Sequence, residues 1–504
     1  MIASGKTINH SILFVLIAFT LFNCNSPSKP ADEGTHETIV EGPYFGNGFR
    51  NGWADQQSIV IWTRLTTIPD LNQSGVHFKE LNKNQRDSLD KSADKEAIHK
   101  AQIPEGYTLD QMDASCPGSN GEVKLTYYPV GKPESKVETS WNAVDQSKNF
   151  TKQWQLNDLK ANTSYAVSIQ ARKDGNSDVS DTIEGVFKTA PSSTDVEPIN
   201  FTVVTGHDYN RRDDPENGHK IYNSMMDEDL DFYVHTGDIE YYDKYNPWAM
   251  TEEMMRYKWD RLFALPFQRK FYANTTSYFI KDDHDVLSDD SHPGMTYGTV
   301  SFERGLEIFD QEQFPSADKT YKTVRWGKDL QVWIVEGRRY RSKNTDPDGP
   351  DKTIWGEEQK QWLYSTLKES DATYKIIISA TPILGPDRSN KKDNHANVAF
   401  KQEGDEIREF INQFDNVFLA VGDRHWQYVS HLEGTNLWEF SCGPGSDEHA
   451  GGWDQGNLLP EHKFLRVKGG YLRVRVFRED EKSKIRFEHH DVDGNVVNEK
   501  VFGE

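Results

Sequence analysis

Aspartate and histidine residues recur directly behind apolar runs in the second half of the chain. Gly237-Asp238, Asp283-His284 and Gly422-Asp423 each follow such a run, and His425 stands two residues after the last pair. A glycine lets the backbone turn tightly so that the next carboxylate faces a crevice, and the carboxyl ends of parallel strands meet at one edge of a sheet. One Gly-Asp pair alone means little, because aspartate is common in turns. Together these segments predict a single clustered site.

The mixture of carboxylate and imidazole in this set predicts metal-dependent hydrolysis. Aspartate oxygens suit iron(III), calcium, magnesium and manganese, and histidine widens the choice to zinc and iron. A set of this kind without cysteine indicates a centre that holds two ions. Because the chain has a formal net charge of −22, an anionic substrate needs a local cation, which a metal ion supplies.

The composition excludes several other classes of function. A net charge of −22 argues against broad binding of nucleic acid or of anionic membranes, since both need a basic surface. With 35% hydrophobic and 27% charged residues, the chain is neither mostly disordered nor a multi-span membrane protein. Its 504 residues exceed the size at which one core keeps growing, so we expect two domains.

Residues 1–24 predict a bacterial export signal. Lys6 precedes an apolar run from Ile12 to Phe22, which is too short to span a bilayer comfortably. The run ends in Leu-Phe-Asn-Cys24, which resembles a lipobox, whose cysteine becomes the lipidated N-terminus. A plain secretory signal cleaved nearby is the alternative. Residues 25–40 are polar and predict a tether, so we expect a periplasmic, outer-membrane or cell-surface lipoprotein that meets the membrane only through its anchor.

The rest of the chain divides near residues 188–198, a segment rich in Pro and Ser. Residues 41–190 contain short β-rich runs that predict a small antiparallel sandwich, and LNDLKANTSYAVSIQA resembles the corner of fibronectin type III modules. Within them, the polar segment 71–120 is predicted to be a solvated insertion, helical in part. From residue 197 buried strands alternate with amphipathic helices and a late hairpin follows, which predicts an α/β domain with a mostly parallel sheet over residues 197–504.

These motifs together resemble the alkaline phosphatase D family of the calcineurin-like metallophosphoesterases. The family's N-terminal Ig-like β-sandwich resembles residues 41–190, which open with GPYFGNGFRN, and its catalytic domain resembles residues 197–504. WGEEQKQWL (355–363) is similar to a scaffold helix of the family, and EGRRYR (336–341) to its Asp-x-Arg-x-Tyr-Arg segment, with Glu336 in place of the aspartate. The resemblance implies an α/β sandwich of two sheets flanked by helices, and a phosphate ester as substrate.

The resemblance also implies a role for each residue of the predicted site. Asp238 is similar to the family's metal-bridging aspartate, Tyr241 to its tyrosinate ligand of iron, and His284 to its catalytic histidine. Asp283 is similar to the metal-binding residue before that histidine. The late metal motif of the family corresponds to Asp423 and His425. A mixed iron and calcium centre is implied, with zinc and manganese left open.

One position departs from the family pattern. The family has Ser-Cys at the end of its first catalytic strand, with the cysteine on iron, whereas this chain has Thr205-Gly206. His207 is predicted to take over as a ligand, and Asp208 either binds a second ion or starts the turn. Replacing thiolate by imidazole changes softness and redox character, which leaves the identity of the first metal open.

Two arginines and a polar loop complete the predicted site. Arg338 and Arg424 are candidates to clamp phosphate oxygens and stabilise charge in the transition state. Each of them alternatively pairs with a carboxylate of the chain. The loop 385–397 (GPDRSNKKDNHAN) either contributes ligands and substrate contacts or is a plain polar loop; its candidates are Asp393, Asn394 and His395.

The sequence thus predicts an exported, metal-dependent phosphoesterase. The expected reaction is in-line attack on phosphorus by a hydroxide bound to the ions, with His284 stabilising the transition state or protonating the leaving group. The motifs do not separate monoesters from diesters, so a phosphodiesterase or phospholipase on the same centre is one alternative. A non-catalytic surface-binding lipoprotein is the alternative outside the enzymes. Cys116 and Cys442 either pair or stay free.

Overall fold

The fold is that of a computed structural model, which describes residues 41–503 apart from residues 93 and 95. The predicted signal peptide, its lipobox-like end and the tether lie outside the described residues. Within the described part, no helix has both the length and the apolar character that crossing a membrane requires. Residues from Glu41 onward group as one unit by their contacts, and the predicted division near residues 188–198 stays a prediction.

Two antiparallel sheets build the N-terminal part of this unit. Buried and open side chains alternate along β7, as expected for a strand with one face in a core. The first sheet has the order β1-β2-β6, and the second has the order β4-β3-β7-β8 with β5 beside β3. The predicted antiparallel strands are confirmed, and their likeness to an Ig or fibronectin module stays a prediction. The bounds are Phe49–Gly52 (β1), Ile59–Arg64 (β2), Glu122–Pro129 (β3), Val137–Glu138 (β4), Asn142–Ala143 (β5), Thr151–Leu156 (β6), Ser164–Arg172 (β7) and Val179–Lys188 (β8).

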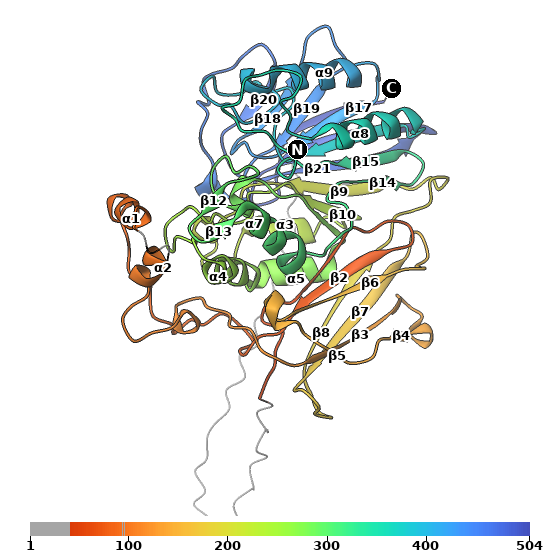
Figure 1. Cartoon of the computed structure of the whole chain (residues 1–504). Helices are drawn as coiled ribbons and strands as arrows, with labels where there is room; N and C mark the ends of the chain where they lie inside the picture. Colours follow the sequence, from red (N-terminus) through yellow and green to blue (C-terminus); the bar gives the residue numbers. More distant parts are fainter. Residues whose placement is uncertain (1–40, 93, 95, 504) are drawn as a thin grey trace, which may run out of the picture. The chain divides into compact units, whose positions relative to one another are not determined.

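A six-stranded mixed sheet opens the second part of the chain (Figure 1). Strands β11, β10 and β9 run parallel, and β21, β22 and β23 continue the sheet antiparallel, with Leu472 opposite Val203. The predicted closing hairpin, β21 and β22, is therefore confirmed. The bounds are Ile199–Val204 (β9), Phe232–His235 (β10), Ser277–Phe279 (β11), Tyr471–Glu479 (β21), Lys482–His490 (β22) and Val496–Phe502 (β23).

A seven-stranded mixed sheet has the order β14-β15-β16-β17-β19-β18-β20. Its central strands β15, β16, β17 and β19 are parallel, and β14, β18 and β20 pair antiparallel. The expectation of a mostly parallel sheet was therefore wrong, and the two sheets that the resemblance implied are present. The bounds are Lys322–Trp326 (β14), Leu330–Ile334 (β15), Tyr374–Ser379 (β16), Val417–Val421 (β17), Gln427–His431 (β18), Trp438–Cys442 (β19) and His462–Arg466 (β20).

The two mixed sheets share one core, and helices cover their outer faces. Phe201 and Val203 of β9 belong to the same buried cluster as Val332 and Ile334 of β15. The other faces pack against helices, α3 to α5 on the six-stranded sheet and α8 and α9 on the seven-stranded sheet. This layering places the carboxyl ends of both sets of parallel strands beside one another. The bounds are Lys220–Met226 (α3), Glu252–Phe263 (α4), Pro266–Asn274 (α5), Asp283–Val286 (α6), Phe302–Glu307 (α7), Glu357–Glu369 (α8) and Lys401–Ile411 (α9).

The predicted solvated insertion is in part a docked segment. It contains the helices α1 (Lys83–Asp90) and α2 (Ala97–Gln102). The Gln102 side chain exchanges two hydrogen bonds with the backbone of Trp248, at 3.0 and 2.7 Å. The Tyr257 hydroxyl of α4 donates to the Asp113 carbonyl at 2.5 Å. The helical part of the prediction is confirmed and most of the segment is exposed or half-buried, whereas these contacts with its neighbours were not predicted, because a charged sequence does not show which polar side chains bind another element.

The two cysteines of the described part, Cys116 and Cys442, are both buried and free. Of the two alternatives left by the sequence, the free thiols are therefore the ones observed. Burial raises the pKa of each thiol to about 12. Both thiols therefore stay protonated at neutral pH.

Candidate metal centre and active site

The loop after β10 delivers Asp238 to the site. Asp238 has a φ of 56° and the preceding Gly237 a φ of 103°, both in the left-handed region. A Cβ on residue 237 would lie 2.5 Å from the backbone nitrogen of Asp282, so only glycine fits this close approach of two loops. The tight turn predicted from Gly237-Asp238 is therefore present, and it brings Asp238 beside the loop that follows β11.

A single carboxylate ties these two loops together. Asp285 accepts hydrogen bonds from the backbone N–H groups of Asp238, Ile239, Glu240 and Asp282, at 2.8, 2.8, 3.2 and 2.8 Å. It is fully buried. Four N–H donors on one carboxylate fix the backbone on both sides of the site.

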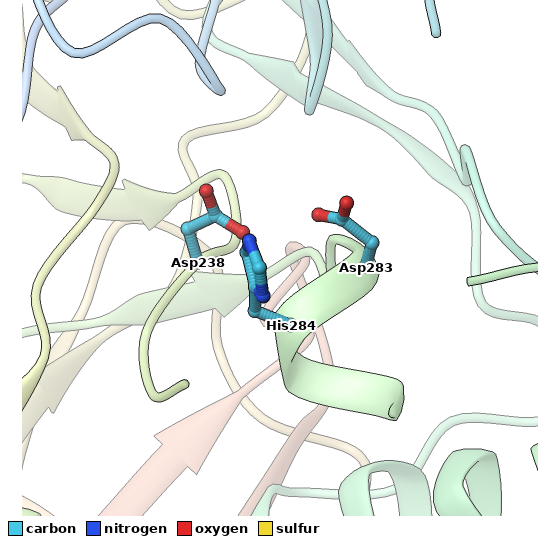
Figure 2. Close-up of side chains that lie close together, drawn as sticks. All are labelled: Asp238, Asp283 and His284. Atoms are coloured by element: carbon cyan, nitrogen blue, oxygen red, sulfur yellow. The ribbon is translucent and has the colours of Figure 1, made fainter. Parts of the chain in front are cut away.

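Carboxylates from three loops meet at the ends of these strands. One group consists of Asp238, Asp283 and His284, and another of Asp238, Asp282 and Asp423; within each group one potential ligand atom per residue lies within 4.8 Å of the others. Figure 2 shows Asp283 and His284 on the short helix α6 and Asp238 on the neighbouring loop. Both groups share Asp238.

The charge balance of this cluster fits bound cations. The Oδ1 atom of Asp238 and the Oδ2 atom of Asp282 are buried and have no hydrogen-bond partner within the described part of the chain. Burial, together with the charges of Asp283 and Asp423, raises the pKa of Asp238 well above its usual value. A bound metal ion would neutralise the repulsion between these carboxylates and would give their unpartnered oxygens a ligand bond.

A second set of donors lies on the other side of Asp238. The Tyr241 hydroxyl donates to Oδ2 of Asp238 at 2.9 Å and lies 3.1 Å from Nε2 of His425. Nε2 of His425 is 3.6 Å from the same carboxylate oxygen. A carboxylate, a phenol and an imidazole therefore surround one point. Asp238 lies between this point and the group formed with Asp282, Asp283 and Asp423.

His284 is held by a carboxylate that sequence reasoning did not assign. Its Nδ1 atom lies 2.7 Å from Oδ1 of Asp243, and its ring lies 4.3 Å from the ring of Tyr241. Burial alone would lower the pKa of His284, but Asp243 and Asp283 outweigh it and raise the pKa to about 10. His284 is therefore a cation at neutral pH in the metal-free protein, with its second nitrogen, Nε2, facing Asp289 at 3.8 Å.

Both predicted clamp arginines are buried and paired. Nε and Nη2 of Arg338 each lie 2.5 Å from Oδ1 of Asp282. Arg424 contacts Asp387 at 2.7 Å, Asp393 at 2.9 Å and Asp423 at 2.9 Å. These contacts match the alternative in which the arginines orient carboxylates of the chain, and each arginine holds a member of the acidic group.

His207 and Asp208 stand next to the centre and belong to none of the groups described above. Nδ1 of His207 lies 2.8 Å from Nε2 of His235, and its ring lies 4.6 Å from that of His219. The Asp208 side chain accepts the N–H of Asn210 at 3.0 Å and begins the short turn Tyr209–Arg211. The turn role considered for Asp208 is therefore observed, and ligand roles for both residues stay predictions.

The loop 385–397 is built around its own polar contacts. The Asn394 amide donates to Asp387 at 2.8 Å, and His395 lies 2.9 Å from Glu403. The Asp393 carboxylate accepts a hydrogen bond from the Arg424 guanidinium and lies 3.3 Å from the Lys391 ammonium group. The loop thus supports the site through Asp393, while Asn394 and His395 have structural partners.

The sequence left four residues of this region without a role. Asp282 and Asp243 lie inside motifs that were already selected, KDDHDV and TGDIEYYD, so spacing alone offered no reason to choose between neighbouring aspartates. No sequence motif singled out the two partly exposed cations near the centre. Arg211 lies 5.7 Å from the ring of Tyr241, and Lys391 adjoins Asp393.

Comparison with known proteins indicates the class of enzyme that the chain resembles. Residues 308–484 match the family model described as PhoD-like phosphatase. The curated alkaline phosphatase D of Bacillus subtilis (strain 168) is 23% identical over 434 residues, which are 69% of this chain and 70% of that protein. A phosphatase, and hence a phosphoesterase, is the class that these matches define.

Solved structures agree with the fold. A structure of PhoD matches with a TM-score of 0.66 at 16% identity, over 92% of this chain and 90% of that chain. The purple acid phosphatase PPD1 from seeds of yellow lupin (Lupinus luteus) matches with a TM-score of 0.59 at 11% identity, over 91% and 74%. The chain is thus similar to PhoD-like phosphatases over residues 308–484, and it shares the fold of PhoD.

Proposed function

We propose that the protein is a metal-dependent phosphoesterase whose reaction takes place at Asp238. The observation that carries this proposal is the convergence of Asp423 with three buried aspartates, Asp238, Asp282 and Asp283, of which Asp238 and Asp282 each have an unpartnered oxygen. Isolated buried carboxylates are costly, so a protein retains such a group where it binds cations. Phosphate esters are the substrate class, and the site itself does not favour monoesters over diesters.

The residues divide into two ligand sets that share Asp238. Asp282, Asp283 and Asp423 would hold an ion that prefers oxygen, such as calcium or manganese. Tyr241 and His425 would hold an ion that accepts imidazole and phenolate, such as iron or zinc. When bound, the ions neutralise charge on the phosphate oxygens and activate a water molecule as nucleophile.

His284 is proposed to donate a proton to the leaving oxygen. Asp243 holds the Nδ1 side of the ring at 2.7 Å, which leaves the proton on Nε2 for transfer. Arg338 keeps Asp282, and Arg424 keeps Asp423, at the site. The partly exposed Arg211 and Lys391 would attract an anionic substrate into a chain whose net charge is −22.

The Asp238→Asn variant tests the proposal. Because Asp238 belongs to both ligand sets, we expect the variant to lose most bound metal and at least about 10³-fold in kcat, on the scale of losing a main electrostatic contribution to catalysis. Metal content by elemental analysis and hydrolysis of model mono- and diesters measure both effects. The control is Asp371→Asn, since Asp371 pairs with Arg325 at 2.6 Å on the surface. Near-normal hydrolysis by Asp238→Asn would refute the proposal.

We also propose that the protein is exported and anchored through Cys24. The support is the sequence alone: the short apolar run and the lipobox-like residues that end in Cys24. A periplasmic, outer-membrane or cell-surface phosphatase would meet phosphate esters outside the cytoplasm.

A further inference from the structure

A buried histidine beside the proposed centre has an unused nitrogen. His449 lies at the end of the short helix Asp447–His449 and is 3% exposed. Its Nδ1 atom is 2.9 Å from the backbone carbonyl oxygen of His207. Its Nε2 atom is buried and has no hydrogen-bond partner within the described residues.

The carbonyl contact fixes the tautomer of this ring. A carbonyl oxygen only accepts hydrogen bonds, so Nδ1 of His449 carries the proton and donates it. In the neutral ring Nε2 then carries a lone pair. Histidines that bind metals use the same arrangement, in which the second nitrogen donates to a carbonyl or carboxylate and thereby orients the ring.

The ring of His449 packs against two of the proposed ligands. Its centre lies 4.1 Å from that of the His425 ring and 5.1 Å from that of the Tyr241 ring. Gly206 lies directly beside both imidazole rings, at ordinary van der Waals distance. A Cβ on residue 206 would lie 3.5 Å from Cε1 of His449 and 3.4 Å from Cδ2 of His425.

The loop that carries His449 is fastened to the end of β9. The Gly445 N–H donates to the Gly206 carbonyl at 2.8 Å, and the Ser446 hydroxyl donates to the Arg211 carbonyl at 2.6 Å. Beyond His449, the Gly451 N–H donates to the His425 carbonyl at 3.0 Å. The ring is therefore held in place relative to His425 by the backbone on both sides.

An unpartnered Nε2 alone does not make a ligand, as His490 shows. His490 donates through Nδ1 to the Gly494 carbonyl at 2.9 Å, is 2% exposed and also has an unpartnered Nε2. Its ring stacks on Tyr471 at 4.7 Å, and Nδ1 lies 3.6 Å from Glu228. What distinguishes His449 is its place beside a phenol and an imidazole that already converge on Asp238.

We propose that His449, through Nε2, is a further protein ligand of the ion held by Asp238, Tyr241 and His425. This inference rests on the proposed metal-dependent function. It gives that ion two imidazoles, one phenolate and one carboxylate, a set that suits iron, zinc or cobalt better than calcium. On this proposal His449 supplies the imidazole ligand that the sequence predicted to come from His207.

Metal binding by His449→Gln and by the matched variant His490→Gln tests the inference, with Co²⁺ as the probe. We expect His449→Gln to bind one of the two ions at least about tenfold more weakly. Its Co²⁺ form should also lose one strongly shifted imidazole N–H resonance in the proton NMR spectrum. His490→Gln should keep the wild-type affinity and spectrum. Unchanged affinity and spectrum in His449→Gln would overturn the inference.

A second variant, His449→Cys, tests the inference by the appearance of a new absorption band, and it applies even if His449→Gln fails to fold. In His449→Cys the thiol would replace the imidazole, and a bound Co²⁺ should then give a thiolate charge-transfer band in the near ultraviolet. His490→Cys should give none, and a band of equal strength in both variants would overturn the inference. Wild-type protein that binds no metal and hydrolyses no ester would instead refute the proposed function. A wild type that does both, beside an unaffected His449→Gln, refutes only the role of His449.

Discussion

At the scale of single residues, the site depends on the pairing of each chemically active group with a neighbour that orients it. Asp243 orients His284, Arg338 orients Asp282, and each contact is 2.7 Å or shorter. Side chains held by a second layer of hydrogen bonds keep their geometry through the reaction.

The Asp243→Asn variant is expected to lose the cationic state of His284. The raised pKa of His284, about 10, depends first on Asp243 once burial is overcome. We expect kcat for an alkyl phosphate, whose leaving oxygen needs a proton, to fall by about 10²-fold, within the range of general acid catalysis. For a nitrophenyl phosphate, whose leaving group is stable as an anion, the loss should stay below about tenfold. Equal losses for both esters would exclude the proposed proton donation.

Residue types and their positions behind strands were sufficient to predict much of this site. Asp238, Asp283, His284, Asp423 and His425 are all brought together, and Tyr241 joins them. Asp243 and His449 could not be predicted, because their roles depend on which neighbour a ring faces. The sequence also could not show that Arg338 and Arg424 are already paired, since any buried arginine near a phosphate site is a candidate clamp.

At the scale of elements, polar contacts join the N-terminal sheets to the helices of the second part. Arg64 at the end of β2 lies 3.0 Å from Asp260 of α4, and Asn149 donates to the same carboxylate at 2.9 Å. Both charged partners are buried. The buried strands predicted from apolar runs correspond to β9, β10, β11, β15, β16 and β17. Strands β14, β18, β19 and β20 were not predicted, because strands with interleaved polar residues resemble loops.

Removal of the Arg64 charge should destabilise this junction in a pH-dependent way. Burial raises the pKa of Asp260 to about 6 even beside Arg64, so the stability contributed by its protonated form is complete below about 4 and is lost as pH rises through 6. Arg64→Met leaves the carboxylate unpaired and should cost about 3–5 kcal/mol. Denaturant unfolding at pH 5 and pH 8 should show the larger loss at pH 8.

The pair Arg172–Glu122 supplies the control for this experiment. It joins β7 and β3 of one sheet at 2.7 Å, with both side chains about one-fifth exposed. Arg172→Met should cost less than about 1 kcal/mol, as partly exposed pairs do. A loss for Arg64→Met no larger than this, at either pH, would contradict a linking role for the buried pair.

At the scale of the whole molecule, the chain combines a strongly acidic composition with a centre that we propose to bind cations. A formal net charge of −22 would concentrate metal ions near the protein. An exported location would expose the same centre to calcium and transition metals outside the cytoplasm. The anchor proposed at Cys24 decides whether the enzyme stays with the membrane after export.

The Cys24→Ser variant separates these two outcomes. A lipidated wild type should incorporate labelled fatty acid and sediment with membranes, and the variant should do neither. Cys116→Ser is the matched control, because Cys116 is a buried thiol and cannot be the lipidated N-terminus. Release of the wild type into the soluble fraction without label would support the plain secretory signal instead.

The carboxylate of Asp285 has a consequence for how the centre is assembled. Its four hydrogen bonds are made to the backbone of the two loops, and they involve no ligand atom of the proposed ions. We therefore expect the loops to keep this shape without an ion, so that occupation of the site requires little reorganisation of the chain. The metal-free and metal-bound proteins should thus have the same backbone conformation. Which metal occupies the site would then depend on the metals available in the surroundings, because exchange requires no refolding.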